Sequence, residues 1–167
     1  MLIKILRYIK GTKKLALNFN EKTNITIYND ASYNDISSNC DSTSGFLLNI
    51  GENPISWISK KQPICPLSTT EAELNANVES IKHIKWITDL FKEAKIFKKE
   101  IMNIKDFIDN KSCIYQIKNK VINSKNKYYA LRIIFLNQYV KLLKLNIEFI
   151  EGGPVNKQKE ITNKLLS

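Results

Sequence analysis

The 167-residue sequence has one histidine, three cysteines, four prolines and five glycines. The single histidine, His83, excludes a metal site built from several histidines. The cysteines Cys40, Cys65 and Cys113 are odd in number and far apart, and no CxxC pair occurs. Neither a zinc site nor a disulfide framework is therefore indicated. This cysteine usage favours a reducing intracellular setting, without distinguishing cytoplasm from nucleus.

Long apolar runs are also missing. No stretch approaches the ~18 consecutive apolar residues that span a bilayer, and residues 1–10 mix Lys and Arg among apolar positions, unlike a signal peptide. We expect no membrane partner. Lys and Arg number 26 against 16 Asp and Glu, a formal net charge of +10. This balance favours nucleic acid or an acidic surface as partner. A genome that favours Lys, Asn and Ile codons explains the charge equally well.

Hydrophobic spacing predicts a mixed α/β domain with one sheet. The length fits a single domain. Apolar periodicity and turn residues predict helices and strands in alternation along the chain. The order is a helix over 2–10, strands over 24–30, 45–50 and 55–60, a helix over 68–95, a strand over 101–109, helices over 110–119 and 128–145, a strand over 146–150 and a helix over 157–166. One sheet covered by helices is the architecture typical of this order.

The helix over 68–95 has the clearest start signal in the chain. Ser68 can cap it, and Glu71 stands three residues later in the capping-box position.

The aromatic residues Trp57 and Trp86 are expected to be buried or half-buried packing residues. We interpret Cys113, like Cys65, as a small buried hydrophobe.

Acidic residues stand at the ends of several predicted elements. Asp30 and Asp109 each end a strand, where open α/β sheets place their ligand sites. Glu71 and Glu73 lie in the first turn of the long helix, and Glu160 in the first turn of the last one. Each acid alone is typical of a structural role, since acids complement a helix dipole. Together they favour a two-metal phosphodiester hydrolase, because carboxylates are the ligands that Mg²⁺ prefers.

Several motifs resemble one family in order and spacing. The segments "NDASYND", "STSGFLLNIGENPISWISKKQ", "LSTTEAELNA" and "FIDNKS" resemble the ribonuclease H domain of copia-type LTR retrotransposon Pol polyproteins. The opening "ILRYIKGTKKLAL" resembles the end of the preceding reverse transcriptase. The resemblance implies a tail of the reverse transcriptase or connection segment over 1–20 and a ribonuclease H-like domain over 21–167. It implies a mixed five-stranded sheet with helices on both faces.

The resemblance also implies an activity and its residues. Such domains are endoribonucleases that cut the RNA strand of an RNA–DNA hybrid with two Mg²⁺ or Mn²⁺ ions. Their Asp-Glu-Asp-Asp set matches Asp30, Glu73, Asp109 and, with a longer side chain, Glu160 as catalytic and metal-binding residues. Glu71 is the alternative to Glu73. The two side chains differ by about 200° around a helix, so only one of them can face the site.

The family also implies partners for the chain. Ser68, Thr69, Asn110 and Lys111 lie next to the matched acids and are candidates for contact with the hybrid. The reverse transcriptase domain of the same polyprotein is a second expected partner.

Two departures from the family pattern support an alternative function. The family's fourth acid is Asp where this chain has Glu160. Its "KHID" motif is replaced by "KYYA", so that Tyr128 and Ala130 stand where the motif has His and Asp. The alternative is a catalytically impaired relic that binds nucleic acid without cutting it.

Overall fold

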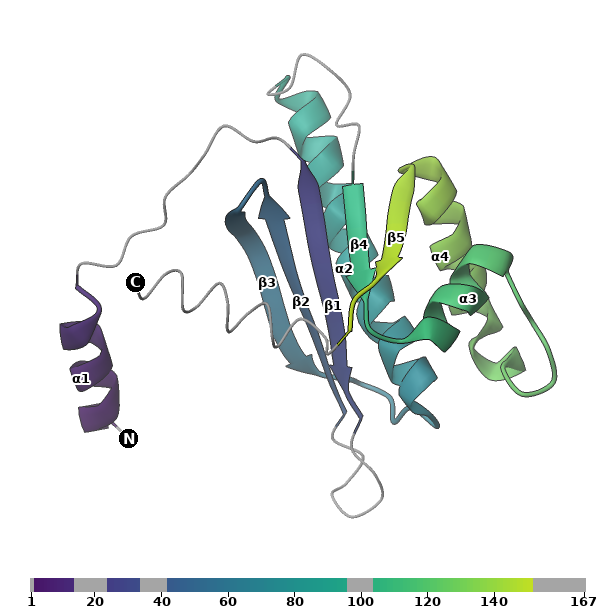
Figure 1. Ribbon diagram of the computed structural model, residues 1–167, viewed down its shortest axis with the longest axis horizontal. Coiled ribbons are helices and arrows are strands. Elements are labelled where there is room, and N and C mark those ends of the chain that lie inside the picture. The colour runs from purple at the N-terminus through teal and green to yellow at the C-terminus, as the bar shows by residue number, and fades with distance from the viewer. Residues whose placement is uncertain (1, 14–23, 34–41, 96–103, 152–167) are drawn as a thin grey trace.

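A single mixed sheet organises the chain in the computed structural model, which describes residues 2–13, 24–33, 42–95 and 104–151. Five strands lie in the order β3-β2-β1-β4-β5 (Figure 1). Their bounds are Ile25–Ser32 for β1, Thr43–Ile50 for β2, Asn53–Lys61 for β3, Ile104–Ile108 for β4 and Leu145–Phe149 for β5.

The strand directions follow from the connections. The first three strands form an antiparallel meander, whereas β4 runs parallel to β1 and β5 runs parallel to β4. The β2–β3 connection is tight, and Gly51 supplies its left-handed backbone with φ 62°. Parallel neighbours need long crossovers, which the helices provide. The predicted mixed five-stranded sheet is confirmed.

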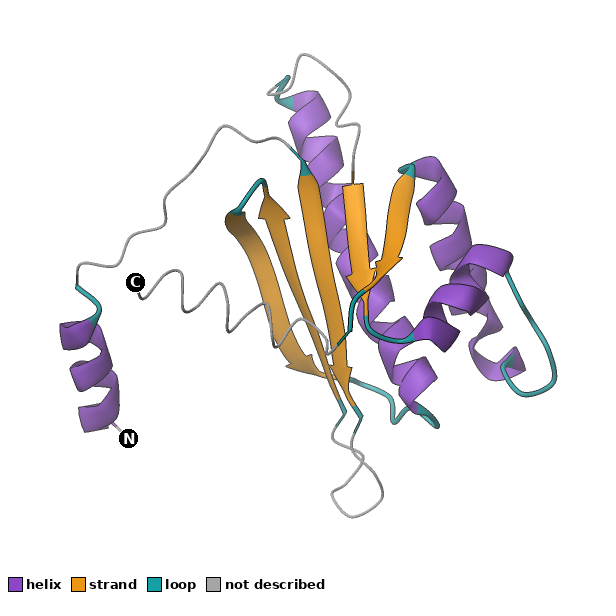
Figure 2. Cartoon of the chain, viewed as in Figure 1, coloured by secondary structure: helices purple, strands orange, loops and turns teal. Residues whose placement is uncertain are grey.

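Helices cover the sheet and one another (Figure 2). The longest, α2 (Thr69–Glu93), packs on β1 and β2. Helix α3 (Lys111–Asn119) follows β4, and a 3₁₀ turn (Lys127–Tyr129) leads into α4 (Ala130–Leu142), which contacts α2, α3 and β5. The helix predicted over 157–166 lies outside the described residues.

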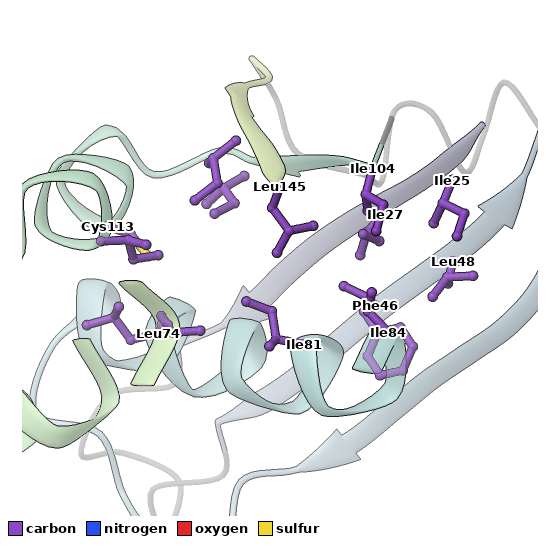
Figure 3. Packing of buried hydrophobic residues seen from close by; sticks show 14 of the residues in the cluster. Ile25, Ile27, Phe46, Leu48, Leu74, Ile81, Ile84, Ile104, Cys113 and Leu145 are labelled. Carbon is purple, nitrogen blue, oxygen red and sulfur yellow. The ribbon is translucent and has the colours of Figure 1, made fainter. Parts of the chain in front are cut away.

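The hydrophobic core lies between the sheet and α2 (Figure 3). Ile27 and Leu48 point from neighbouring strands toward Leu74, Ile81 and Ile84 of the helix, and all five are at most 1% exposed. Strand alternation places every second residue on this face, and helical spacing aligns the α2 residues. Each such side chain contributes about 1.5–3 kcal/mol by leaving water.

Two packing predictions are wrong. Trp57 is 65% exposed and Trp86 is 63% exposed. Trp57 lies on the edge strand β3, and it alternates with Ile58, which packs against the core. Trp86 lies between the buried Ile84 and Ile87 in sequence but on another side of the helix.

One of the two cysteines interpreted as small buried hydrophobes differs from expectation. Cys65 is exposed and disulfide-bonded, although the sequence indicates no disulfide framework. Cys113 is a free, fully buried thiol, as expected of a small hydrophobe.

The first helix, α1 (Leu2–Gly11), lies apart from the sheet (Figure 1). Its apolar side chains are exposed, including Ile3 at 66% and Leu6 at 57%. Residues 14–23 lie outside the described part, so the division into 1–20 and 21–167 stays a prediction. Among the described helices, none has both the length and the apolar character needed to cross a membrane.

Candidate metal-binding carboxylate site

Two parallel strands bring the first two acids together. Asp30 lies near the end of β1, and Asp109 directly follows β4. Because β1 and β4 are neighbours and run parallel, their carboxyl ends reach the same edge of the sheet. Both residues are partly exposed. The edge therefore presents two carboxylates that solvent can reach.

The third acid comes from the first turns of α2. Ser68 caps this helix by accepting a hydrogen bond from the backbone N–H of Glu71, 3.1 Å away. This start places Glu73 over the end of β1, where its Oε1 accepts a hydrogen bond from the backbone N–H of Ala31 at 3.1 Å. The other oxygen, Oε2, is buried and has no hydrogen-bond partner among the described residues.

The three acids form one cluster. One carboxylate oxygen each from Asp30, Glu73 and Asp109 lies within 4.8 Å of the others. Glu71 is turned away from them: it accepts hydrogen bonds from Arg132 Nη1 at 3.1 Å and from the backbone N–H of Leu67 at 2.9 Å. The structure thus brings Glu73, and not the alternative Glu71, to the two aspartates. Glu71 makes only half of the predicted capping box, since its side chain bonds Leu67 and not Ser68.

Burial and mutual repulsion favour a proton in the cluster. Burial, followed by the nearby charges of Asp109 and Asp30, raises the pKa of Glu73 from 4.5 to about 9. Burial and then Asp109 also raise the pKa of Asp30. Like charges disfavour ionisation, and a cation reverses this preference. The arrangement suits a divalent cation because it offers several carboxylate oxygens, one of them buried and unpartnered.

Asp106 and Asn29 form a buried polar pair that the sequence analysis does not predict. Asp106 of β4 is fully buried, and its Oδ1 accepts a hydrogen bond from Asn29 Nδ2. Burial raises the pKa of Asp106 to about 7. Strand alternation carries the signal, because Asp106 falls between Ile104 and Ile108 on the core-facing side. Asp and Glu are almost never fully buried unless they are paired, so an acid at a core-facing position indicates a polar partner inside the core.

The buried thiol lies in the same polar region. Asn77 of α2 directs its Nδ2 toward Cys113 Sγ, 3.9 Å away, and donates to the backbone oxygen of Glu73 at 2.9 Å. Burial, followed by the charges of Glu73, Asp106 and Asp109, raises the pKa of the Cys113 thiol. The thiol therefore stays protonated beside the acids.

The remaining predicted site residues flank the cluster. Asn110 caps α3 by accepting from the backbone N–H of Cys113 at 2.9 Å, just as Ser68 caps α2. Thr69 is exposed at the start of α2. Lys111 Nζ lies 4.6 Å from the centre of the Phe149 ring. The fourth predicted acid, Glu160, lies outside the described residues.

Solved structures share this fold at low sequence identity. The LC11-RNase H1 isolated from compost has a TM-score of 0.62 at 13% identity, over 86% of this chain and 96% of that one. A crystal structure of LC11-RNase H1 in complex with an RNA/DNA hybrid has a TM-score of 0.57 at 16% identity, over 86% and 99%. RNase H1 from the archaeon Halobacterium salinarum has a TM-score of 0.56 at 12% identity, over 84% and 98%. The fold is that of ribonuclease H.

Proteins that are similar in sequence indicate a narrower class of relative than the shared fold does. The chain is 30% identical over 140 residues to the retrovirus-related Pol polyprotein from transposon RE2 of Arabidopsis thaliana, covering 83% of this chain and 10% of the relative. It is 32% identical over 148 residues to that from transposon TNT 1-94 of Nicotiana tabacum, covering 85% and 11%. No family model matches. The chain is thus similar in sequence to retrovirus-related Pol polyproteins from transposons and has the fold of ribonuclease H, as the resemblance in the sequence motifs predicts. It spans about a tenth of the length of these curated relatives.

Proposed function

We propose that the chain is a divalent-metal-dependent endoribonuclease that cuts the RNA strand of RNA–DNA hybrids. The observation that carries this proposal is the convergence of Asp30, Glu73 and Asp109 within 4.8 Å at one edge of a ribonuclease H-like sheet. Glu160 is proposed as the fourth acid, on the family pattern alone.

The carboxylates fit Mg²⁺ or Mn²⁺, and we propose two ions. All the donors are hard oxygens, which these ions prefer. Asp30, Glu73 and Asp109 would hold one ion, and Asp30 with Glu160 the other. Two-metal sites supply charge stabilisation at both the attacking and the leaving oxygen of a phosphodiester.

The protein's own residues prepare the site. The Ala31 N–H fixes one oxygen of Glu73, so the other oxygen, Oε2, is oriented before any ion arrives. The raised pKa of Glu73 keeps a proton in the cluster until a cation replaces it, so loading releases a proton. Preorganised ligands of this kind cost little reorganisation when substrate binds.

The hybrid is the substrate that best fits the fold and the charge. One neighbour of the same fold has been solved with an RNA/DNA hybrid bound. The chain carries a formal net charge of +10, which favours a polyanionic backbone. We propose that Ser68, Thr69, Asn110 and Lys111 contact the hybrid and that 2′-hydroxyls mark its RNA strand. The reverse transcriptase of the same polyprotein is proposed as a partner, because the relatives are Pol polyproteins.

Cleavage of a labelled hybrid tests the proposal. Wild-type protein should cut only the RNA strand, with Mg²⁺ or Mn²⁺ and not with EDTA. Asp30→Asn should abolish cutting. Asp89→Asn is the matched control: this acid lies on α2 and pairs with Lys85, away from the cluster, and its loss should leave the rate unchanged.

The same assay separates the alternative function. Tyr128, which is 75% exposed, and Ala130 replace the family's His and Asp, and this favours a relic. A relic would bind the hybrid tightly and cut nothing in any buffer. A Glu160→Asp variant that gains cutting would place the impairment at the fourth acid.

A further inference from the structure

Asn77 is a buried amide on α2, four residues after Glu73, at a position where packing alone favours an apolar side chain. It is fully buried, and its neighbours at helical spacing, Leu74 and Ile81, belong to the hydrophobic core. Its Oδ1 is buried and has no hydrogen-bond partner among the described residues. An unpaired buried carbonyl lowers stability. Asn77 therefore breaks a packing rule close to the carboxylate cluster, which is typical of a functional site.

The nitrogen of this amide connects the two elements that position Glu73 and Asp109. Asn77 Nδ2 donates to the backbone oxygen of Glu73 at 2.9 Å and lies 3.9 Å from the Sγ of Cys113 on α3. A side-chain amide has two N–H groups, so both contacts can form at once. The backbone N–H of Cys113 donates to Asn110 Oδ1 at 2.9 Å, and Asn110 directly follows Asp109. A continuous series of contacts thus runs from Glu73 to Asp109.

These contacts act on a distance that the sheet does not set. Asp109 precedes α3 and Glu73 lies on α2, so their separation depends on how these two helices pack against each other. Figure 3 shows Cys113 at the same end of the core as Leu74, near the start of α2. Packed helices can slide slightly past one another, whereas a buried hydrogen-bond network favours one position. The series therefore restricts movement of one acid relative to the other.

We propose that Asn77 and Cys113 are positioning residues that fix the spacing of Glu73 and Asp109, so that the cluster selects a small divalent cation over a larger one. The inference rests on the proposed function for the presence of a cation. Mg²⁺ requires near-ideal octahedral geometry with oxygens at about 2.0–2.1 Å, whereas Ca²⁺ accepts flexible arrangements at about 2.3–2.6 Å. A fixed spacing therefore favours Mg²⁺, and a loosened spacing admits Ca²⁺.

Calorimetric titration of the metal-free protein with Mg²⁺ and with Ca²⁺, without nucleic acid, tests the inference. Asn77→Leu should lower the ratio of Mg²⁺ affinity to Ca²⁺ affinity about tenfold, the lower end of the effect of substitutions behind metal ligands. Cys113→Ala should lower this ratio less, because sulfur is a weak acceptor. Cys113→Ser should keep the wild-type ratio, because its hydroxyl still accepts from Asn77.

The melting temperature separates positioning from folding. Asn77→Leu removes an unpaired buried carbonyl and introduces a better helix former, so the metal-free variant should melt at or above the wild-type temperature while it loses selectivity. Asn77→Ala, which cannot overpack the core, should lose the same selectivity.

Asn137→Leu is the matched control. This buried asparagine of α4 donates to the backbone oxygens of Ile117 at 2.8 Å and Lys118 at 3.2 Å, in the last turn of α3 and away from the cluster. Its loss should lower the melting temperature and leave the affinity ratio unchanged. The inference is overturned if both Asn77 variants keep the wild-type ratio, if Asn137→Leu loses as much selectivity as they do, or if the wild-type protein binds neither ion.

Failure of the proposed function is a separate result. A chain whose ion selectivity depends on Asn77 but which never cuts a hybrid retains this inference and loses the nuclease proposal. A chain that cuts the hybrid, with an affinity ratio that is insensitive to Asn77, loses this inference alone.

Discussion

Replacing Glu73 with Gln should make the metal-free protein more stable above pH 5. The residue Glu73 is 5% exposed, and burial with the charges of Asp109 and Asp30 raises the pKa of its carboxyl from 4.5 to about 9. Between these values the folded protein holds a proton that the unfolded chain has released. Stability from this group is therefore full below pH 4.5 and is lost as the pH rises toward 9.

The size of the effect follows from the shift. Each pH unit inside the window costs about 1.4 kcal/mol for one proton, so wild-type protein loses on the order of 4 kcal/mol between pH 5 and pH 8 through this residue. Glu73→Gln keeps an oxygen that can accept from the Ala31 N–H and cannot ionise. Its advantage over wild type should therefore grow with pH.

Urea unfolding in EDTA at pH 5, 6.5 and 8 measures this directly. The stability difference between variant and wild type should be small at pH 5 and rise to several kcal/mol at pH 8. Saturating Mg²⁺ should shrink the difference, since a cation stabilises the ionised wild-type carboxylates. A difference that stays constant from pH 5 to pH 8 would refute the assignment of a buried proton to Glu73.

Three further outcomes are expected. Glu71→Gln should lower the free energy of unfolding by about 1–3 kcal/mol in urea, because Arg132 loses its partner, in contrast to the gain at Glu73. Asp106→Asn should be close to wild type at pH 4 and more stable at pH 8, because burial raises the pKa of Asp106 to about 7; equal gains at both pH values would contradict this. Ile84→Ala should cost about 2–5 kcal/mol and lower the melting temperature, since Ile84 is fully buried beneath the sheet, and a cost under 1 kcal/mol would argue against that packing.

Much of the fold could be predicted because its signals are local. Apolar residues such as Ile25 and Ile27 occupy alternate positions at the start of β1, which is typical of a strand, and the Ser68 cap marks the start of α2. The positions of Asp30 and Asp109 at strand ends follow from the same patterns. Their convergence depends on β1 and β4 being parallel neighbours, which no local pattern contains.

The details that sequence reasoning missed depend on tertiary contacts. Glu71 and Glu73 look alike as first-turn acids, and only the position of Arg132 on α4 shows which one turns away. Strand alternation places Asp106 on the core-facing side, but its hydrogen-bond partner Asn29 comes from another strand and is known only from the structure. The sequence predicts packing for Trp57, whereas the side chain is exposed because β3 is an edge strand.

Calorimetric titration with Mn²⁺ tests the central claim most directly, that three carboxylates remote in sequence form one cation site. Runs at pH 7 in two buffers of different ionisation enthalpy would count the protons released. We predict saturable binding to wild type with release of close to one proton, and strongly weakened binding to Asp109→Asn. Equal binding by the two proteins, or binding without proton release, would contradict the account.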